Sequence, residues 1–210
     1  MSNQSNNFNT PPELIAPIKE FWGGKIDLDP CSNKTSLVKA ETEWSLPTNG
    51  LFQPWGINYP KKTTVFINPP YGPYYISNNG IVQSPSEHKK MLEFRYTVFG
   101  ASSWVRHTIK GWLVCGKESA QSGNCDCIFL IPARGTGSTV WQNVIYPFSD
   151  AVCYLKKRTP FWEGGEPCKG PTGEVSPGTF DCALVYFGSE AKRFRQHFNK
   201  LGYVVIQDRS

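Results

Sequence analysis

The sequence has few charged residues and no long apolar segment. Only 19% of its 210 residues are charged, whereas 39% are hydrophobic and 14% are aromatic. This balance favours a folded chain over a disordered one. No apolar run approaches the roughly 20 residues that a membrane span needs, so we expect no membrane association. The first ten residues are polar and lack the basic and apolar regions of a signal peptide, which predicts a disordered tail over residues 1–9 and a cytoplasmic protein.

The sequence also lacks the spacing typical of a metal site or a disulfide framework. None of the seven cysteines forms a Cys-x-x-Cys pair, and the closest two, Cys125 and Cys127, are separated by one residue, which is poor spacing for zinc. The three histidines lie far apart in the chain. We therefore expect no bound metal and reduced thiols. The net charge of +5 is compatible with a polyanionic partner but does not identify one.

What the sequence does contain is an alternation of apolar segments with helical patterns. Strands are expected at 26–29, 65–67, 127–132, 151–155, 183–187 and 203–207, and helices at 11–22, 103–117, 139–145 and 192–201. Thr10 is expected to cap the first helix. The alternation predicts an α/β fold with a mostly parallel sheet and helices on both faces. The last two strands are candidates for an antiparallel edge pair, residues 161–179 are expected to form a loop, and the length suits a single domain over residues 10–210.

The most informative segment is Asn68-Pro69-Pro70-Tyr71. It follows the apolar run 64–67, so it lies where a buried strand ends, and ligands of open α/β sheets bind at such carboxyl ends. The prolines stiffen the loop. The Asn68 carboxamide oxygen and the Pro69 carbonyl can then accept both N–H groups of an exocyclic amine and aim its lone pair at a methyl donor. Tyr71 offers a face for a base taken out of its stack, although a plain proline-rich turn is the alternative.

Polar residues near the first and second expected strands suit a cofactor. Asp27 and Asp29 share one side of the first strand. A carboxylate there can bind the amino group or the ribose hydroxyls of S-adenosylmethionine, although it can also cap the next turn. The side-chain carbonyl of Asn49 can accept the adenine amino group of the same cofactor, and Leu51 can pack on the adenine ring. On its own, Asn49-Gly50 is more typical of a plain turn.

Cations follow two further expected strands. Arg134 stands beside the loop 135–139, whose backbone amides can hold a phosphate that Arg134 also pairs with. Lys156-Lys157-Arg158 follows the strand at 151–155, where a contact with the DNA backbone is plausible. Solvated loops are the alternative for both segments.

Taken together, these segments resemble the phage DNA N-6-adenine-methyltransferase (Dam-like) family over about residues 10–188. The matching segments occur in the order of that family. They are Thr10-Pro11, Asp27-Leu28-Asp29-Pro30-Cys31, Asn49-Gly50-Leu51 with Trp55, Asn68-Pro69-Pro70-Tyr71-Gly72, Trp104 opening a helix, Leu130-Ile131-Pro132-Ala133-Arg134 with Trp141, and Arg158-Thr159-Pro160-Phe161.

The resemblance implies a Rossmann-like S-adenosylmethionine-dependent methyltransferase fold and site-specific methyl transfer to the N6 amine of adenine in double-stranded DNA. It implies a target-base site made of Asn68, Pro69, Pro70 and Tyr71. The residues implied for the cofactor site are Thr10, Pro11, Asp27, Asp29, Pro30, Cys31, Asn49 and Leu51. A phage-encoded enzyme of this family would act in the host cytoplasm.

The sequence departs from the family pattern in three places. Asn49 stands where the family usually has Asp, no Gly-x-Gly follows Asp29, and residues 73–100 are longer than the family norm. We interpret 73–100 as an insertion over the mouth of the site, with Lys89, Lys90 and Arg95 as DNA contacts; a surface loop is the alternative.

Other functions remain compatible with these segments. The same chemistry can act on cytosine N4, an RNA base or a protein glutamine. A nucleic-acid-binding protein that has lost cofactor binding is a further alternative. The sequence indicates no oligomeric state.

Overall fold

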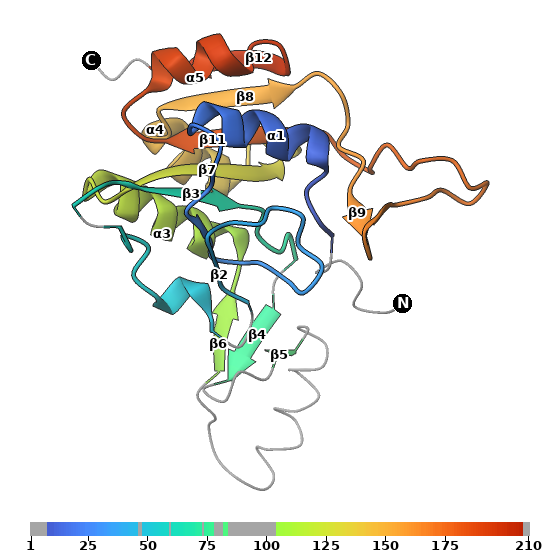
Figure 1. The fold of residues 1–210 in the computed structure, drawn as a ribbon, viewed down its shortest axis with the longest axis horizontal. Coiled ribbons are helices and arrows are strands. Elements are labelled where there is room, and N and C mark those ends of the chain that lie inside the picture. Colours follow the sequence, from blue (N-terminus) through green and yellow to red (C-terminus); the bar gives the residue numbers. More distant parts are fainter. Residues whose placement is uncertain are drawn as a thin grey trace, which may run out of the picture.

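The structure is a computed structural model that describes residues 8–45, 48–58, 60–72, 74–77, 82–83 and 104–207. Its centre is a seven-stranded sheet with the strand order β12-β8-β11-β7-β3-β1-β2 (Figure 1). These strands are β1 (Leu28–Asp29), β2 (Thr42–Glu43), β3 (Thr63–Ile67), β7 (Cys125–Pro132), β8 (Ala151–Leu155), β11 (Cys182–Phe187) and β12 (Gly202–Ile206). The helical elements are α1 (Pro12–Phe21), the 3₁₀ turn η2 (Gly50–Phe52), α3 (Ile109–Gln121), the π-helical turn η3 (Trp141–Ile145), α4 (Tyr146–Phe148) and α5 (Ala191–Phe198).

Most strands of the central sheet run in one direction. β1 pairs in parallel with both β2 and β3, and β3 pairs in parallel with β7. β11 lies antiparallel between β7 and β8, so β8 runs the same way as β7, and β12 is antiparallel to β8 at the edge. The expected α/β fold with a mostly parallel sheet is confirmed. The last two strands do not pair with each other, because β8 lies between them.

Helices cover both faces of the sheet, as the alternation predicts. α1 and α5 pack on one face, whereas α3 and η3 pack on the other, and Figure 1 shows these two layers on either side of the strands. The side chains of β3 pack into both of these layers. Phe66 belongs to the cluster under α1 and α5, while Val65 and Ile67 belong to the cluster under α3. Burial on both faces explains why this strand is apolar at successive positions.

The expected helix at 103–117 is wrong at its start. Residues 104–107 form β6 (Trp104–His107), and α3 begins only at Ile109. Thr108 marks the boundary because its backbone is extended and its side-chain oxygen accepts the Gly111 N–H at 3.4 Å, as an N-cap residue does. Trp104 therefore ends up in a strand and does not open a helix.

The start of the chain also differs from expectation. Pro11, not Thr10, is the N-cap of α1, and no side chain caps that helix. Phe8 and Asn9, which we expected in the tail, belong to the fold. The Asn9 N–H donates to the Trp162 carbonyl at 2.7 Å, and the Trp162 N–H donates back at 3.1 Å. The rest of the expected tail, residues 1–7, lies outside the described residues.

Two small sheets lie outside the central one. β9 (Trp162–Glu163) and β10 (Glu166–Pro167) pair antiparallel, so the expected loop at 161–179 contains a short hairpin. β4 (Tyr74–Ser77) pairs antiparallel with β5 (Val82–Gln83) and with β6, and Figure 1 shows these three strands below the central sheet. Of the expected insertion at 73–100, only β4 and β5 fall within the described residues. None of the helices in the described part of the chain has the length and apolar character that a membrane span requires.

Candidate active site

The switch point of the central sheet lies between β1 and β3. β2 follows β1 along the chain and pairs with one side of it, whereas β3 and then β7 lie on the other side. Ligands of open α/β sheets bind beyond the carboxyl ends of the strands at such a point. Asp29 ends β1 and Asn68 follows β3. The two segments singled out from the sequence therefore meet at this edge of the sheet.

A direct contact joins the two loops. The Cys31 Sγ donates to the Asn68 backbone oxygen at 3.4 Å. Burial, together with the neighbouring Asp29, raises the pKa of the Cys31 thiol well above its usual range, so the thiol keeps the proton that it donates. The Cys31 N–H in turn donates to Asp29 Oδ1 at 3.1 Å. The loop after β1 is thus fixed to the loop after β3.

Asp29 is a buried carboxyl group with few polar contacts to offset its loss of hydration. Only 4% of the residue is exposed. Burial raises its pKa to about 7; the Cys31 N–H opposes this shift in part, and the negative charge of Glu43 adds to it. A carboxyl group in this state favours a ligand that brings a hydrogen-bond donor or a positive charge.

The segment Asn49-Gly50-Leu51 is held against the loop after β1. A Cβ atom on Gly50 would lie 2.0 Å from the Pro30 carbonyl oxygen, so only glycine allows this approach. Trp55 Nε1 donates to the Gly50 carbonyl at 2.8 Å. Asn49 has a left-handed backbone with φ 51°, and its Oδ1 is buried with no hydrogen-bond partner among the described residues. A plain turn does not account for such an unpaired acceptor.

Three further residues were expected to bind the cofactor: Thr10, Leu51 and Pro11. Thr10 is buried, and its Oγ1 also lacks a hydrogen-bond partner in the described part of the chain. Leu51 packs against the hydrophobic cluster under α3. Pro11, in contrast, is the N-cap of α1 and lines a different groove.

Asp27 is held by Thr64 of β3 and by Lys25. Its Oδ2 accepts both the N–H and the hydroxyl of Thr64, each at 2.9 Å. Its Oδ1 lies 3.4 Å from Lys25 Nζ. Burial alone would raise the pKa of Asp27, but the Thr64 donors and Lys25 outweigh it and lower that pKa. In the structure Asp27 ties the start of β1 to β3, and its expected contact with a cofactor stays a prediction.

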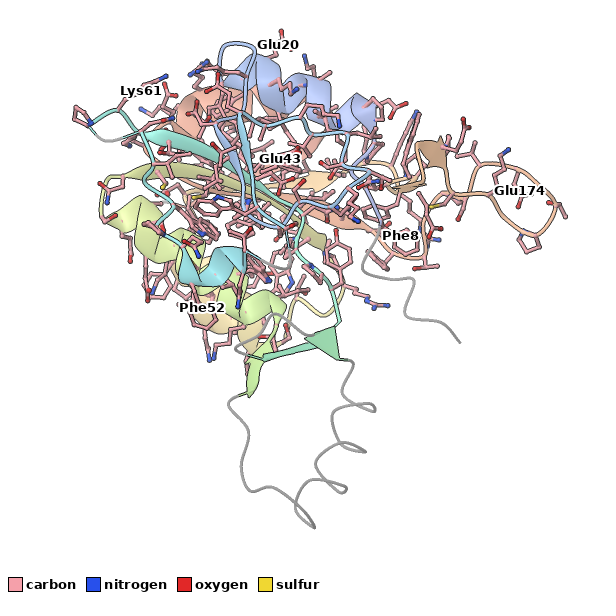
Figure 2. The ribbon with its side chains drawn as sticks, turned by 60° about the horizontal axis from the view of Figure 1, so that its bottom comes forward. Phe8, Glu20, Glu43, Phe52, Lys61 and Glu174 are labelled. Atoms are coloured by element: carbon pink, nitrogen blue, oxygen red, sulfur yellow. The ribbon has the colours of Figure 1, made fainter. Side chains whose placement is uncertain are left out.

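The Asn68 carboxamide is oriented by the N-terminal segment. Its Nδ2 donates to the Phe8 carbonyl oxygen at 3.4 Å. Because a carbonyl can only accept, Oδ1 is the end that faces away from Phe8. Asn9 holds this segment in place, since it pairs with the β9 backbone and its side chain donates to the Thr35 carbonyl at 3.0 Å. Figure 2 shows Phe8 on the side of the molecule away from Lys61, which precedes β3.

Tyr71 belongs to an aromatic cluster. Its ring packs edge-on against Phe161 and Phe180, with centroid distances of 6.0 and 5.5 Å. Its hydroxyl donates to the Leu130 carbonyl at 3.3 Å. Burial raises the pKa of this hydroxyl well above its usual range, so the proton stays on the oxygen. The hydroxyl thus anchors Tyr71 to the end of β7.

Two small cavities flank Tyr71. One has a volume of about 30 Å³ and is lined by Phe8, Cys31, Asn33, Asn68, Pro69, Pro70, Tyr71 and Phe161. The other has a volume of about 110 Å³ and shares Phe8, Tyr71 and Phe161 with the first. Both are smaller than the roughly 300 Å³ at which ligand pockets begin. A planar base therefore requires one of the shared rings to move, and Phe8 is the one at the surface, 38% exposed.

The expected DNA-contacting residues are partly described. Arg134 and Arg158 are exposed at the carboxyl edge of the sheet, and both contact the segment before β11. The Arg134 guanidinium lies 4.8 Å from the Phe180 ring centroid, and Arg158 Nε lies 3.5 Å from Asp181. Lys89, Lys90 and Arg95 lie outside the described residues.

Several residues of the site were not predicted from the sequence. Phe8 and Asn9 lie in a polar, Asn-rich segment whose composition predicts a disordered tail. The single aromatic ring of Phe8 is the one feature of that segment that could have indicated a folded position. The sequence around Gly50 predicts only a turn. In the structure this position must be glycine because a side chain would collide with the Pro30 carbonyl, 20 residues away in the chain. Phe180 follows a Gly- and Pro-rich stretch and is brought to Tyr71 only by the fold.

The cysteines and histidines do not form a metal centre among the described residues, and all seven cysteines are free thiols. Comparison with protein-family models, with curated proteins and with solved structures found no match for this chain. The function is therefore inferred from the chemistry of the site.

Proposed function

We propose that the protein transfers a methyl group from S-adenosylmethionine to the N6 amine of adenine in DNA. The observation that carries the proposal is the pairing of two loops at the switch point, Asn68-Pro69-Pro70-Tyr71 and the loop after Asp29, joined by the Cys31–Asn68 contact. The first loop suits an exocyclic amine, and the second suits the polar end of a cofactor. The mixed sheet is compatible with a Rossmann-like methyltransferase fold.

The buried acceptors of the site fit S-adenosylmethionine, which would supply an electrophilic sulfonium methyl group when bound. Asp29 would accept from its ribose hydroxyls or its ammonium group. Asn49 Oδ1, which is unpaired among the described residues, would accept from its adenine amino group. Thr10 Oγ1 offers a third buried polar contact. An amide oxygen at position 49 accepts a hydrogen bond without a full charge, so Asp29 carries the electrostatic part of this recognition.

The target amine would be held by Asn68 and Pro69. Because Asn68 Nδ2 faces Phe8, Oδ1 is the end of the carboxamide that can accept an amine N–H, and the Pro69 carbonyl would accept the other. The lone pair of an aromatic amine is delocalised into its ring, so fixing both N–H groups directs that lone pair toward the methyl donor. Positioning of this kind supplies much of the rate acceleration in a transfer between two bound groups.

The surrounding residues fit a base extruded from a duplex. Tyr71 and Phe161 would form the walls for the base once the Phe8 ring has moved. Arg134 and Arg158 stand at the same edge and would contact the phosphates on either side of the extruded nucleotide.

The direct test is methyl transfer from labelled S-adenosylmethionine to duplex DNA, RNA and protein offered in parallel. We expect N6-methyladenine in DNA. Asn68→Ala should lower kcat by roughly 10²- to 10³-fold, the scale for one oriented polar group, while the calorimetric affinity for S-adenosylmethionine stays unchanged. Asn124→Ala is the matched control, because Asn124 is an exposed asparagine just before β7, and it should keep full activity.

Three outcomes would change the conclusion. Methylation of cytosine N4, RNA or protein without adenine methylation would keep the chemistry and change the acceptor. Absence of S-adenosylmethionine binding in a folded protein would leave a nucleic-acid-binding protein. Equal activity of Asn68→Ala and Asn124→Ala would remove the amine-binding role of Asn68.

A further inference from the structure

A broad groove lies at the carboxyl edge of the sheet, apart from the candidate active site. It opens between the start of α1, the chain leaving β8 and the segment after β10, and its volume is about 780 Å³. That volume falls within the roughly 300 to 1,000 Å³ typical of small-molecule sites. Its lining contains none of Asp29, Asn49, Asn68 or Tyr71.

Much of the groove lining is aliphatic. Leu14, Leu155, Leu201, Pro160 and Val175 all line it. These elements are held by backbone hydrogen bonds. The Lys156 N–H donates to the Leu201 carbonyl at 3.0 Å, and the Ser176 N–H donates to the Cys168 carbonyl at 2.7 Å. The groove is therefore formed before any ligand enters it.

Val175 stands out among these residues because it is 51% exposed although it is a branched apolar side chain. It belongs to the loop that projects from the body in Figure 2, where Glu174 marks the outer part of that loop. A Lys169–Val175 bridge braces the two strands of the loop. An apolar side chain held at the wall of an apolar groove is placed to cover a bound ligand.

Positive charge gathers at one end of the groove. Lys156, Lys157 and Arg158 follow β8 directly, are exposed and line the groove. Among the described residues neither lysine has an ion-pair partner, whereas Arg158 pairs with Asp181. Glu13 is the acidic residue in the lining. The complementary ligand has an apolar body and a negative head.

We propose that this groove binds an organic monoanion with an apolar aromatic or aliphatic body, whose carboxylate or sulfonate pairs with Lys156 and Lys157. The three leucines and Val175 would remove the body from water. A nucleic-acid strand suits the groove less well, because the lining holds no aromatic side chain on which a base could stack.

Two fluorescent probes with the same frame test this proposal, the anionic 8-anilinonaphthalene-1-sulfonate and the neutral N-phenyl-1-naphthylamine. The wild type should bind both. The double variant Lys156→Ala/Lys157→Ala should raise the Kd of the sulfonate about tenfold, the scale of a lost charge-assisted contact, and leave that of the neutral probe unchanged. Val175→Asp should weaken both probes. Lys192→Ala, which removes an exposed lysine of α5, is the control and should change neither.

The replaced side chains are exposed, so each variant should keep the near-ultraviolet circular dichroism and the unfolding midpoint of the wild type. That comparison separates binding in the groove from binding to loosened protein. The proposal is overturned if the sulfonate binds the double variant and Val175→Asp as tightly as it binds Lys192→Ala. It is also overturned if duplex DNA binding alone depends on the two lysines, since they would then serve only DNA phosphates.

Discussion

Asp29 is the residue whose ionisation most directly affects the site. Its burial raises its pKa to about 7, above the value of 3.8 for a free side chain. Because the folded pKa lies above the unfolded one, the folded state binds this proton more tightly. The resulting stabilisation is fully present below about pH 4 and is lost as the pH rises through about 7.

Asp29→Asn should remove this pH dependence, since the amide does not ionise. Relative to the variant, the wild type should lose up to a few kcal/mol of unfolding free energy between about pH 4 and 8, because one pKa unit corresponds to about 1.4 kcal/mol. Urea unfolding at several pH values measures the difference. Glu43→Gln removes the nearby like charge, which lowers the folded pKa of Asp29, so the loss should be smaller and should end at a lower pH. A wild-type-to-variant difference that is constant with pH would show that Asp29 is ionised throughout.

Tyr71 carries two roles that two substitutions separate. Tyr71→Phe leaves the Leu130 carbonyl without its donor and should cost about 0.5 to 1.5 kcal/mol of stability, with most of the methyl transfer kept. Tyr71→Ala removes the ring from the Phe161 and Phe180 cluster. It should destabilise the protein by about 3 kcal/mol or more and lose a further 1 to 3 kcal/mol of base stacking. Urea unfolding and kcat measure the two effects, and a Phe variant as inactive as the Ala variant would assign the catalytic effect to the hydroxyl.

Among the elements, η2 and the loop after β1 are in close backbone contact. Their backbones meet at Gly50 and Pro30, and a Cβ on Gly50 would lie 2.0 Å from the Pro30 oxygen. This contact places the Asn49 oxygen, which has no hydrogen-bond partner in the described part of the chain, near the loop that follows Asp29. The geometry of the proposed cofactor site thus depends on the absence of a side chain at Gly50.

Gly50→Ala should therefore push η2 away from β1. We expect a loss of more than the 1 to 3 kcal/mol typical of overpacking and a strong loss of S-adenosylmethionine affinity. Gly111→Ala is the matched control, because its Cβ would meet only Leu51 at 3.9 Å in α3. Helix propensity predicts a gain of up to about 1 kcal/mol there. Chemical denaturation and calorimetry give both quantities, and equal behaviour of the two variants would refute the steric account.

The elements differ in how well their sequences predicted them. β8 and β11 are apolar at successive positions and were predicted within a residue of their bounds, since burial on both faces leaves a strong pattern. The residues at 104–107 were predicted as helix because Trp104 and Val105 continue the helical spacing of α3. Their pairing with β4 is a long-range contact that no local pattern encodes. For the same reason, the Asn68 loop was predictable, whereas its hydrogen bond to Phe8, 60 residues away, was not.

For the molecule as a whole, one edge of the sheet gathers the site and the described cations proposed to contact DNA. The double variant Arg134→Ala/Arg158→Ala should weaken DNA binding and flatten its dependence on salt by about one unit of slope for each lost phosphate contact. S-adenosylmethionine affinity should not change. Arg195→Ala removes an exposed arginine of α5, on a face of the sheet, and should leave the slope intact. Equal slopes for the double variant and Arg195→Ala would exclude this edge as the DNA-binding surface.

The raised pKa of Asp29 also makes ligand capture a proton-releasing event. At neutral pH a large fraction of Asp29 carries its proton, and a ligand that donates to both carboxylate oxygens must displace it. The surrounding buffer takes up that proton, so the heat of S-adenosylmethionine binding at pH 7 should differ between Tris and phosphate. In Asp29→Asn this difference should vanish. On the proposed function, the fraction of protein that holds S-adenosylmethionine would thus rise with pH across neutrality.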